Sequence, residues 1–295
     1  MGPGARVDDR AESEEAPRLR STATEMWAVA RLDLGDIVRS RWMVFCAVVY
    51  GLLGAAFVLV GMRESMVLGF SGMGRVLMSM VHALLLLLPL LALTATGQVI
   101  NRARDDGTLE LLFTLPMRRG TYFAAVSLTR YLVLIVPLLV VMGFMALLGR
   151  FAFGQEMSWA FLAQAMGICA AVVLAFVGLG IAVSTLVRSQ TKAVIWTLLF
   201  WAAGVALLDF GLVGLMLKWR LNAETVFLIA SLNPVQAARM ALLAGASPEL
   251  SVLGPVGFYL SHRIGASALF ALGLVWPAVF GLVAWLVALR SFSRR

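Results

Sequence analysis

The chain has 295 residues, of which 61% are hydrophobic and only 14% are charged. Soluble domains contain about 45–50% apolar and about 25% charged residues, so this composition excludes a soluble globular protein. The net charge of +8 does not indicate nucleic-acid binding, because the basic residues lie mostly in short segments between apolar runs.

Residues 1–22 mix acidic and basic side chains and contain no apolar core, so they predict a disordered tail and not a secretory signal. The next segment, 25–41, predicts an amphipathic helix that lies in the headgroup plane ahead of the first span. Its apolar positions are Trp27, Ala30, Leu34, Ile37 and Val38, and its polar positions are Asp33, Asp36, Arg39 and Ser40. Val29 and Leu32 break this pattern. A plain extension of the first span is the alternative interpretation.

Six apolar runs follow, each long enough for an α-helix to cross a membrane. They predict an all-α membrane protein with spans at about 42–62, 76–98, 121–148, 159–187, 194–217 and 266–289. Most Lys and Arg residues fall on the segments that lie inside if the N-terminus is cytoplasmic. We therefore expect a multi-pass protein of the inner (cytoplasmic) membrane, surrounded by lipid, with both termini in the cytoplasm.

Two connections are longer than simple turns. The inner link, 99–120, is first charged and then apolar, and it predicts a short helix that is capped by Asp106 or Thr108 and ended by Pro116. The helix would present Leu109, Leu112 and Phe113 on a cytoplasmic surface. An exposed apolar helix of this kind usually docks into a groove of a partner protein; the alternative is an interfacial helix that touches only lipid. The outer link, 218–265, predicts a further helix at about 235–244, ended by Gly245.

The inner link, which runs Asp-Gly-Thr-Leu-Glu-Leu-Leu from Asp106 and reaches Leu-Pro at Pro116, resembles that of ABC-2-type exporter permeases. The resemblance covers nearly the whole chain and implies that 23–295 form the permease transmembrane domain. It also implies that the short helix is a coupling helix held by a separate ABC ATPase, which would carry ATP and Mg²⁺. The residues that would contact this ATPase are Gly107, Thr108, Leu109, Glu110, Leu112 and Phe113, flanked by Arg118 and Arg119.

Three later segments narrow the resemblance to the NosY type, the permease of the nitrous-oxide-reductase maturation system. They are 184–189 between the fourth and fifth spans, 207–214 around Asp209, and 232–235 with Asn233 and Pro234. This resemblance implies a periplasmic β-helix partner and a role in assembling a copper–sulfur enzyme centre. Asn233 and Pro234 would then belong to an outer segment that docks a partner or gates a path.

Asp209 is the one acidic residue well inside a predicted span. A carboxylate at mid-bilayer costs about 2.5–3.5 kcal/mol on insertion scales, so Asp209 either lines the transport path or snorkels to the outer surface. Small residues recur every fourth position at Ala163, Gly167, Ala171 and Ala175, which permits close helix packing, either inside the chain or between subunits.

No phosphate-binding loop and no strong metal motif occurs in the sequence, so no catalytic residue, metal site or cofactor is predicted on this chain. Six spans make half of an exporter, which predicts a homodimer. The favoured function is an ATP-driven exporter of a small species, and the NosY resemblance suggests a sulfur-containing one. Export of another small or lipophilic cargo, and a membrane scaffold for assembly factors without transport, are the alternatives.

Overall fold

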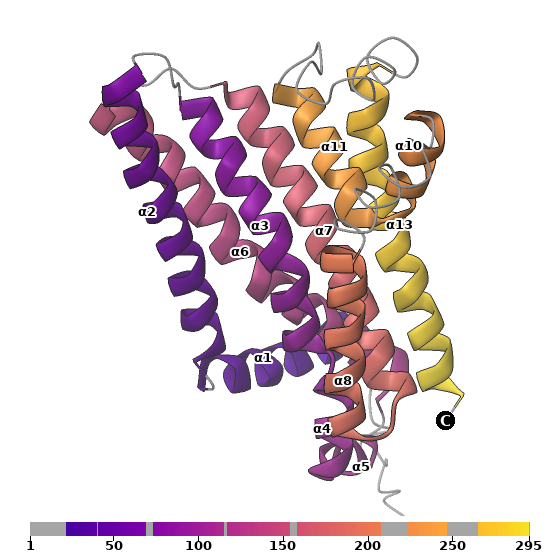
Figure 1. The fold of residues 1–295 in the computed structure, drawn as a ribbon. Coiled ribbons are helices and arrows are strands. Elements are labelled where there is room, and N and C mark those ends of the chain that lie inside the picture. The colour runs from indigo at the N-terminus through magenta and orange to yellow at the C-terminus, as the bar shows by residue number, and fades with distance from the viewer. Residues whose placement is uncertain are drawn as a thin grey trace, which may run out of the picture.

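The structure is a computed structural model, and it describes residues 22–39, 41–68, 73–114, 117–153, 158–207, 223–246 and 265–294. All regular elements among these residues are helices, as the sequence predicted. They are α1 (Thr22–Arg39), α2 (Trp42–Leu68), α3 (Met73–Thr96), α4 (Val99–Asp105), α5 (Thr108–Phe113), α6 (Arg119–Phe153), α7 (Trp159–Leu186), α8 (Gln190–Trp201), the π-helix η1 (Ala202–Leu207), α10 (Ala223–Leu232), α11 (Pro234–Ala246) and α13 (Ala266–Ser293). The long helices form a bundle, and α1, α4 and α5 lie together at one end of it, here called the α5 end (Figure 1).

The described residues contain four stretches that are long and apolar enough to cross a membrane, and a fifth if the bent pair α1–α2 counts as one span. The four are Ser79–Asp105, Arg119–Phe151, Trp159–Leu186 and Ala266–Ser293. The predicted fifth span, 194–217, is covered by α8 and η1 only as far as Leu207, and its remainder lies outside the described residues. The number six therefore stays a prediction. The C-terminal end of α13 lies at the α5 end, as does α1 (Figure 1). The placement of both termini in the cytoplasm stays a prediction.

Helix α1 lies across the bundle and not along it, with a bend of 62° between it and α2 (Figure 1). Ile37 and Val29 face the bundle and are buried, whereas Trp27 and Val38 are exposed. The single apolar stripe predicted for this segment is therefore wrong in detail, because α1 has an inward apolar side as well as an outward one. Val29 broke the predicted pattern because it belongs to the inward side.

Helices α7 and α13 pack so closely that their backbones touch at glycines. A Cβ atom added at Gly178 would lie 2.8 Å from the carbonyl carbon of Gly281, and one added at Gly273 would lie 2.6 Å from the carbonyl oxygen of Ala237 in α11. In the predicted ladder of small residues, Ala171 and Ala175 are buried inside the chain while Ala163 is exposed. The inner half of the ladder therefore serves packing within the chain.

The predicted helix at 235–244 is present as α11, although it continues through Gly245 to Ala246. Asn233 fixes its start, because its Oδ1 accepts from the backbone N–H of Val235 at 2.9 Å. The Nδ2 of Asn233 donates to the carbonyl oxygen of Gly204, which ties α11 to the π-helix η1. Asn233 and Pro234 are both buried, so the chain itself uses the side chain that the sequence assigned to partner docking.

Candidate coupling site

The inner link folds as two short helices, α4 and α5, joined at Gly107. Gly107 has a φ of 71°, a left-handed conformation that glycine adopts without the steric cost of a Cβ atom. Gly107 is also the N-cap of α5, and no side chain caps this helix. The predicted caps, Asp106 and Thr108, are therefore wrong. At the other end the Thr114 hydroxyl donates to the carbonyl of Leu111 at 2.7 Å, and Pro116 lies outside the described residues.

The exposed apolar side chain of α5 is Leu111, which is 72% accessible. Leu109 is buried at 7%, and Leu112 and Phe113 are half-buried against the core. The prediction that Leu109 would lie on the surface is therefore wrong. A six-residue helix has only one or two turns, so the side that faces the bundle takes up most of its apolar residues. Leu111, which the sequence did not single out, forms the outward side together with Glu110 and Thr108, which are exposed.

Phe113 anchors α5 to the ends of two long helices. Its ring lies 6.0 Å from that of Tyr122 in α6, in an edge-to-face arrangement, and 6.2 Å from that of Phe292 in α13. The Arg119 guanidinium carbon lies 5.2 Å from the centre of the Phe113 ring, within cation–π range. Arg118 is exposed beside this cluster. A displacement of α5 would therefore act directly on α6 and α13.

The turn between α7 and α8 holds the link from the other side. The Ser184 hydroxyl accepts from the backbone N–H groups of Ile100 and Asn101, at 2.9 and 3.3 Å. The Gln190 side chain donates to the Asp105 carboxylate at 2.8 Å. Ser184, the first residue of the segment 184–189, therefore bonds the inner link directly.

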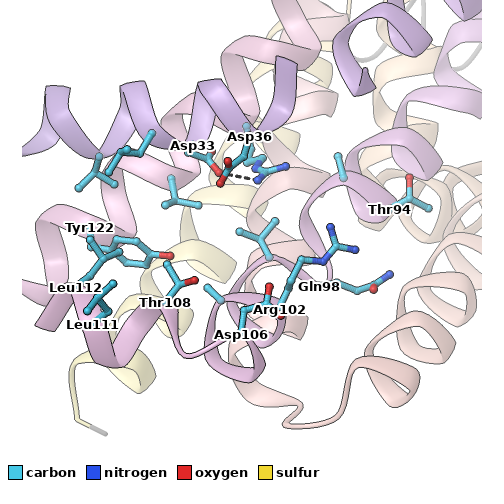
Figure 2. Close-up of a pocket in the computed structure, with 17 residues that line it drawn as sticks. Asp33, Asp36, Thr94, Gln98, Arg102, Asp106, Thr108, Leu111, Leu112 and Tyr122 are labelled. Carbon is cyan, nitrogen blue, oxygen red and sulfur yellow. Dashed lines mark hydrogen bonds and ion pairs between the residues drawn. The ribbon is translucent and has the colours of Figure 1, made fainter. Parts of the chain in front are cut away.

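A polar cavity of about 370 Å³ lies between α1, the α3–α4 junction, α5 and α6. Figure 2 shows Asp33 and Asp36 of α1 on one wall, Gln98, Arg102 and Asp106 on the opposite wall, and Thr108 and Leu112 beside it.

An ion pair closes the α1 wall of this cavity. Arg130 of α6 donates to Asp33 Oδ1 at 2.6 Å, and both side chains are largely buried. Burial raises the pKa of the Asp33 carboxyl, the Arg130 charge opposes that shift, and the nearby Asp36 adds to it. The sequence did not predict this pair. A charged residue inside the predicted span 121–148 signals that a partner is needed, but only the fold shows which carboxylate supplies it.

Of the two predicted functional sites, the structure describes the residues of the coupling site but not Asp209. Asp209 lies outside the described residues, so its place on a transport path stays a prediction. Four of the predicted ATPase contacts, Thr108, Glu110, Arg118 and Arg119, are exposed at the α5 end, and Gly107 is half-buried there. Their contact with the ATPase stays a prediction. Among the described residues, no group of three or more His, Cys, Asp or Glu side chains is arranged to hold a metal ion.

A family model described as ABC-2 family transporter protein matches residues 27–295. The chain belongs to the ABC-2 transporter family. This ABC-2 permease is 26% identical over 274 residues to a protein of Stutzerimonas stutzeri named "Probable ABC transporter permease protein NosY", covering 91% of this chain and 99% of that one. It is also 26% identical over 257 residues to a protein of the same name from Pseudomonas aeruginosa, covering 85% and 93% of the two chains.

The family assignment and the apolar helices together make this ABC-2 permease a multi-pass membrane protein. Membership of the family also implies an ABC ATPase as its partner. In permeases of this kind, ATP hydrolysis takes place on that partner subunit.

Proposed function

We propose that this chain is the membrane-spanning subunit of an ATP-driven ABC exporter of the inner membrane. It crosses the membrane six times, both termini and the α5 end face the cytoplasm, and two copies with two ATPase subunits form the transporter. The observation that carries the proposal is Leu111, a large apolar side chain held 72% exposed on a helix whose other apolar residues anchor it to the bundle. An apolar side chain presented in this way fits a groove on a partner.

The contacts that anchor α5 would transmit a movement of the ATPase to the membrane-spanning helices. Movement of α5 would pass through Phe113 to Tyr122 and Phe292, at the ends of α6 and α13. It would also pass through Asp105 to Gln190, at the start of α8. Closure of the two ATPase subunits would thereby tilt these helices and alternate access to a central path, to which Asp209 contributes a carboxylate.

The cargo that we favour is a small sulfur-containing species, exported for the maturation of a periplasmic copper enzyme of the nitrous-oxide-reductase type. The NosY-named relatives support this cargo, since the match extends over nearly their whole length. In this proposal a periplasmic β-helix protein receives the cargo at the end of the bundle opposite α5.

A second candidate is the export of a lipophilic cargo. An apolar cavity of about 370 Å³ lies between α7, α8, η1, α10, α11 and α13 and is lined by Phe176, Leu179, Phe200 and Phe280. Such a cavity suits an acyl chain better than a small anion. Stimulation of ATP hydrolysis by a phospholipid but not by sulfide or polysulfide would favour this candidate over the first.

The decisive experiment separates docking from folding. The affinity-tagged Leu111→Asp variant is purified from its native membrane, and the amount of ATPase that accompanies it is measured. Because Leu111 projects away from the core, we expect a stable permease that loses its ATPase. Leu186→Asp is the matched control, since Leu186 is also exposed at the α5 end but ends α7, and it should retain the ATPase.

Retention of the ATPase by Leu111→Asp would refute α5 as the coupling helix. A scaffold without transport makes a different prediction, because docking could then persist while no candidate cargo changes the rate of ATP hydrolysis. Cysteine labelling at Leu111 in intact cells and in inverted membrane vesicles tests the orientation. Labelling from the outside of intact cells would contradict it.

A further inference from the structure

The cavity beside α1 shares Thr108, Leu111 and Leu112 with the coupling helix, but its charged side chains have no role in the coupling contacts described above. Its walls carry three carboxylates, Asp33, Asp36 and Asp106, and two guanidinium groups, Arg102 and Arg130 (Figure 2). Opposite charges therefore face one cavity from helices that are far apart in the sequence. A ligand that paired with both the carboxylates and the guanidinium groups would carry a cationic and an anionic group a few bonds apart.

Several of these groups have hydrogen-bonding capacity to spare. Arg130 uses one nitrogen for Asp33, while its Nε and the Asp33 Oδ2 are buried and have no partner. The side chains of Arg102 and Asp36 make no hydrogen bond or ion pair with any described residue, although both line the cavity. Asp36 and Arg102 are exposed, so only Asp33 Oδ2 and Arg130 Nε are buried without a partner. Buried polar atoms without partners destabilise a fold, so a ligand that bonded these two atoms would stabilise this end of the bundle.

The cavity lies at the depth of lipid headgroups if α1 lies in the membrane surface. Helix α1 has the features of such a helix, because Trp27 and Val38 form an outward apolar side and Arg39 and Arg41 follow at its end. The inward side of α1 roofs the cavity through Val29, Asp33 and Asp36. A lipid could reach it with its headgroup while its acyl chains stay in the bilayer.

We propose that this cavity binds the ammonium–phosphate headgroup of a phosphatidylethanolamine from the surrounding membrane. The ammonium group donates to the carboxylates of Asp33 and Asp36, and the phosphate accepts from the Arg102 guanidinium, whose planar fork suits a phosphate. Leu32, an exposed apolar side chain that lines the cavity, contacts the glycerol backbone.

The chemistry of the walls distinguishes this lipid from others. A choline headgroup has no N–H to donate and is usually held by several aromatic faces, whereas Tyr122 is the one aromatic residue among those that line the cavity. An anionic phosphatidylglycerol would add negative charge to walls on which carboxylates already outnumber guanidinium groups. Phosphatidylethanolamine alone of the three supplies a cationic N–H donor for the carboxylates together with a phosphate acceptor for the guanidinium group.

The test uses the full chain in detergent micelles. Native mass spectrometry measures the binding of phosphatidylethanolamine, phosphatidylcholine and phosphatidylglycerol with identical acyl chains. We expect phosphatidylethanolamine to bind about tenfold more tightly than either of the others, as one or two charge-assisted hydrogen bonds would give. Equal binding of the three lipids would overturn the proposal. Soluble phosphoethanolamine is then added as competitor, and displacement at equal concentration would overturn the membrane as the source.

Variants locate the site. Arg102→Gln and Asp36→Asn should each reduce the preference for phosphatidylethanolamine about tenfold, and thermal unfolding without lipid should be unchanged because neither side chain bonds a described residue. The matched control is Arg39→Gln, which removes an exposed arginine of the α5 end that does not line the cavity. An effect of Arg39→Gln equal to that of Arg102→Gln would mean general attraction to headgroups and would refute the site. ATPase docking does not enter this test, so the proposal can fail while the coupling helix stands, and the reverse.

Discussion

Two halves of the bundle are built in opposite ways. Helices α7, α11 and α13 meet through small residues, and the backbones at Gly178 and Gly281 touch. Around α1, α5 and α6 the helices leave a cavity of about 370 Å³ with charged walls, one of which the Asp33–Arg130 ion pair closes, whereas the cavity of the same volume beside α7, α11 and α13 has apolar walls. Close-packed interfaces have few alternative arrangements, whereas hollow, polar ones can rearrange. The difference suggests a rigid half and an adjustable half, with the coupling helix attached to both.

The largest expected effect is a break in the rigid half. Gly178→Leu would force a side chain into the backbone of Gly281, and we expect a loss of about 3 kcal/mol in the free energy of unfolding, or failure to accumulate in the membrane. The measurement is thermal unfolding in detergent. Gly51→Ala is the control, because a Cβ there meets nothing within 4 Å, and it should be neutral or slightly stabilising. Equal losses of unfolding free energy in Gly178→Leu and Gly51→Ala would contradict the close packing of α7 against α13.

The next effect tests the ion pair of the adjustable half. Arg130→Gln should cost about 2–3 kcal/mol in the free energy of unfolding, because the Asp33 carboxylate would remain largely buried without its cation. The double variant Arg130→Gln/Asp33→Asn should lose less than the single one, since no unpaired charge remains. Chemical denaturation of the two proteins measures the difference. If the double variant were the less stable, the pair would be a minor surface contact.

The stability of the single variant Arg130→Gln should depend on pH in a defined direction. Burial already raises the Asp33 pKa, and removal of Arg130 removes the charge that opposed this shift. The folded state then binds the Asp33 proton more tightly than the unfolded chain does. The free energy of unfolding of Arg130→Gln should therefore fall as the pH rises above about 4, the ordinary pKa of an aspartate, and level off above the folded pKa. Thermal unfolding between pH 4 and pH 8 tests this, and a parallel profile in the natural chain would contradict it.

A smaller effect separates the two sides of α5. Phe113→Ala removes a ring that contacts Tyr122 and Phe292, and we expect a loss of about 1–2 kcal/mol in stability. Leu111→Ala should change stability by less than about 0.5 kcal/mol, because its side chain is exposed. Comparison of unfolding midpoints decides this. Similar losses in the two variants would mean that Leu111 also packs against the chain.

The smallest effect concerns the bond between α7 and the link. Ser184→Ala leaves the N–H groups of Ile100 and Asn101 without the hydroxyl acceptor, which should cost about 1 kcal/mol. Hydrogen exchange of those two amides should rise in the variant. Ser189→Ala is the control, since the Ser189 side chain forms no cap at α8, and exchange at the link should not respond to it.

Long apolar runs predicted their helices well. Five of the six predicted spans fall on a long helix, because a run of about 20 apolar residues has one stable form in lipid. The details of short helices were less predictable. For α5 the sequence pattern predicted Leu109, Leu112 and Phe113 as the exposed residues, whereas packing against the bundle, including Tyr122 and Phe292, leaves Leu111 as the exposed one. The partner of Arg130 was hidden for the same reason, since Asp33 is 97 positions away.

Composition and apolar periodicity by themselves determined that the chain is helical, lies in a membrane and has a short helix between its second and third spans. Those properties depend on the transfer of each segment from water to lipid, which is a local quantity. Which side of α5 faces outward, which charges pair and where a polar cavity remains were decided only by the tertiary structure. Each depends on helices far apart in the sequence meeting at one end of the bundle, and no local pattern records that meeting.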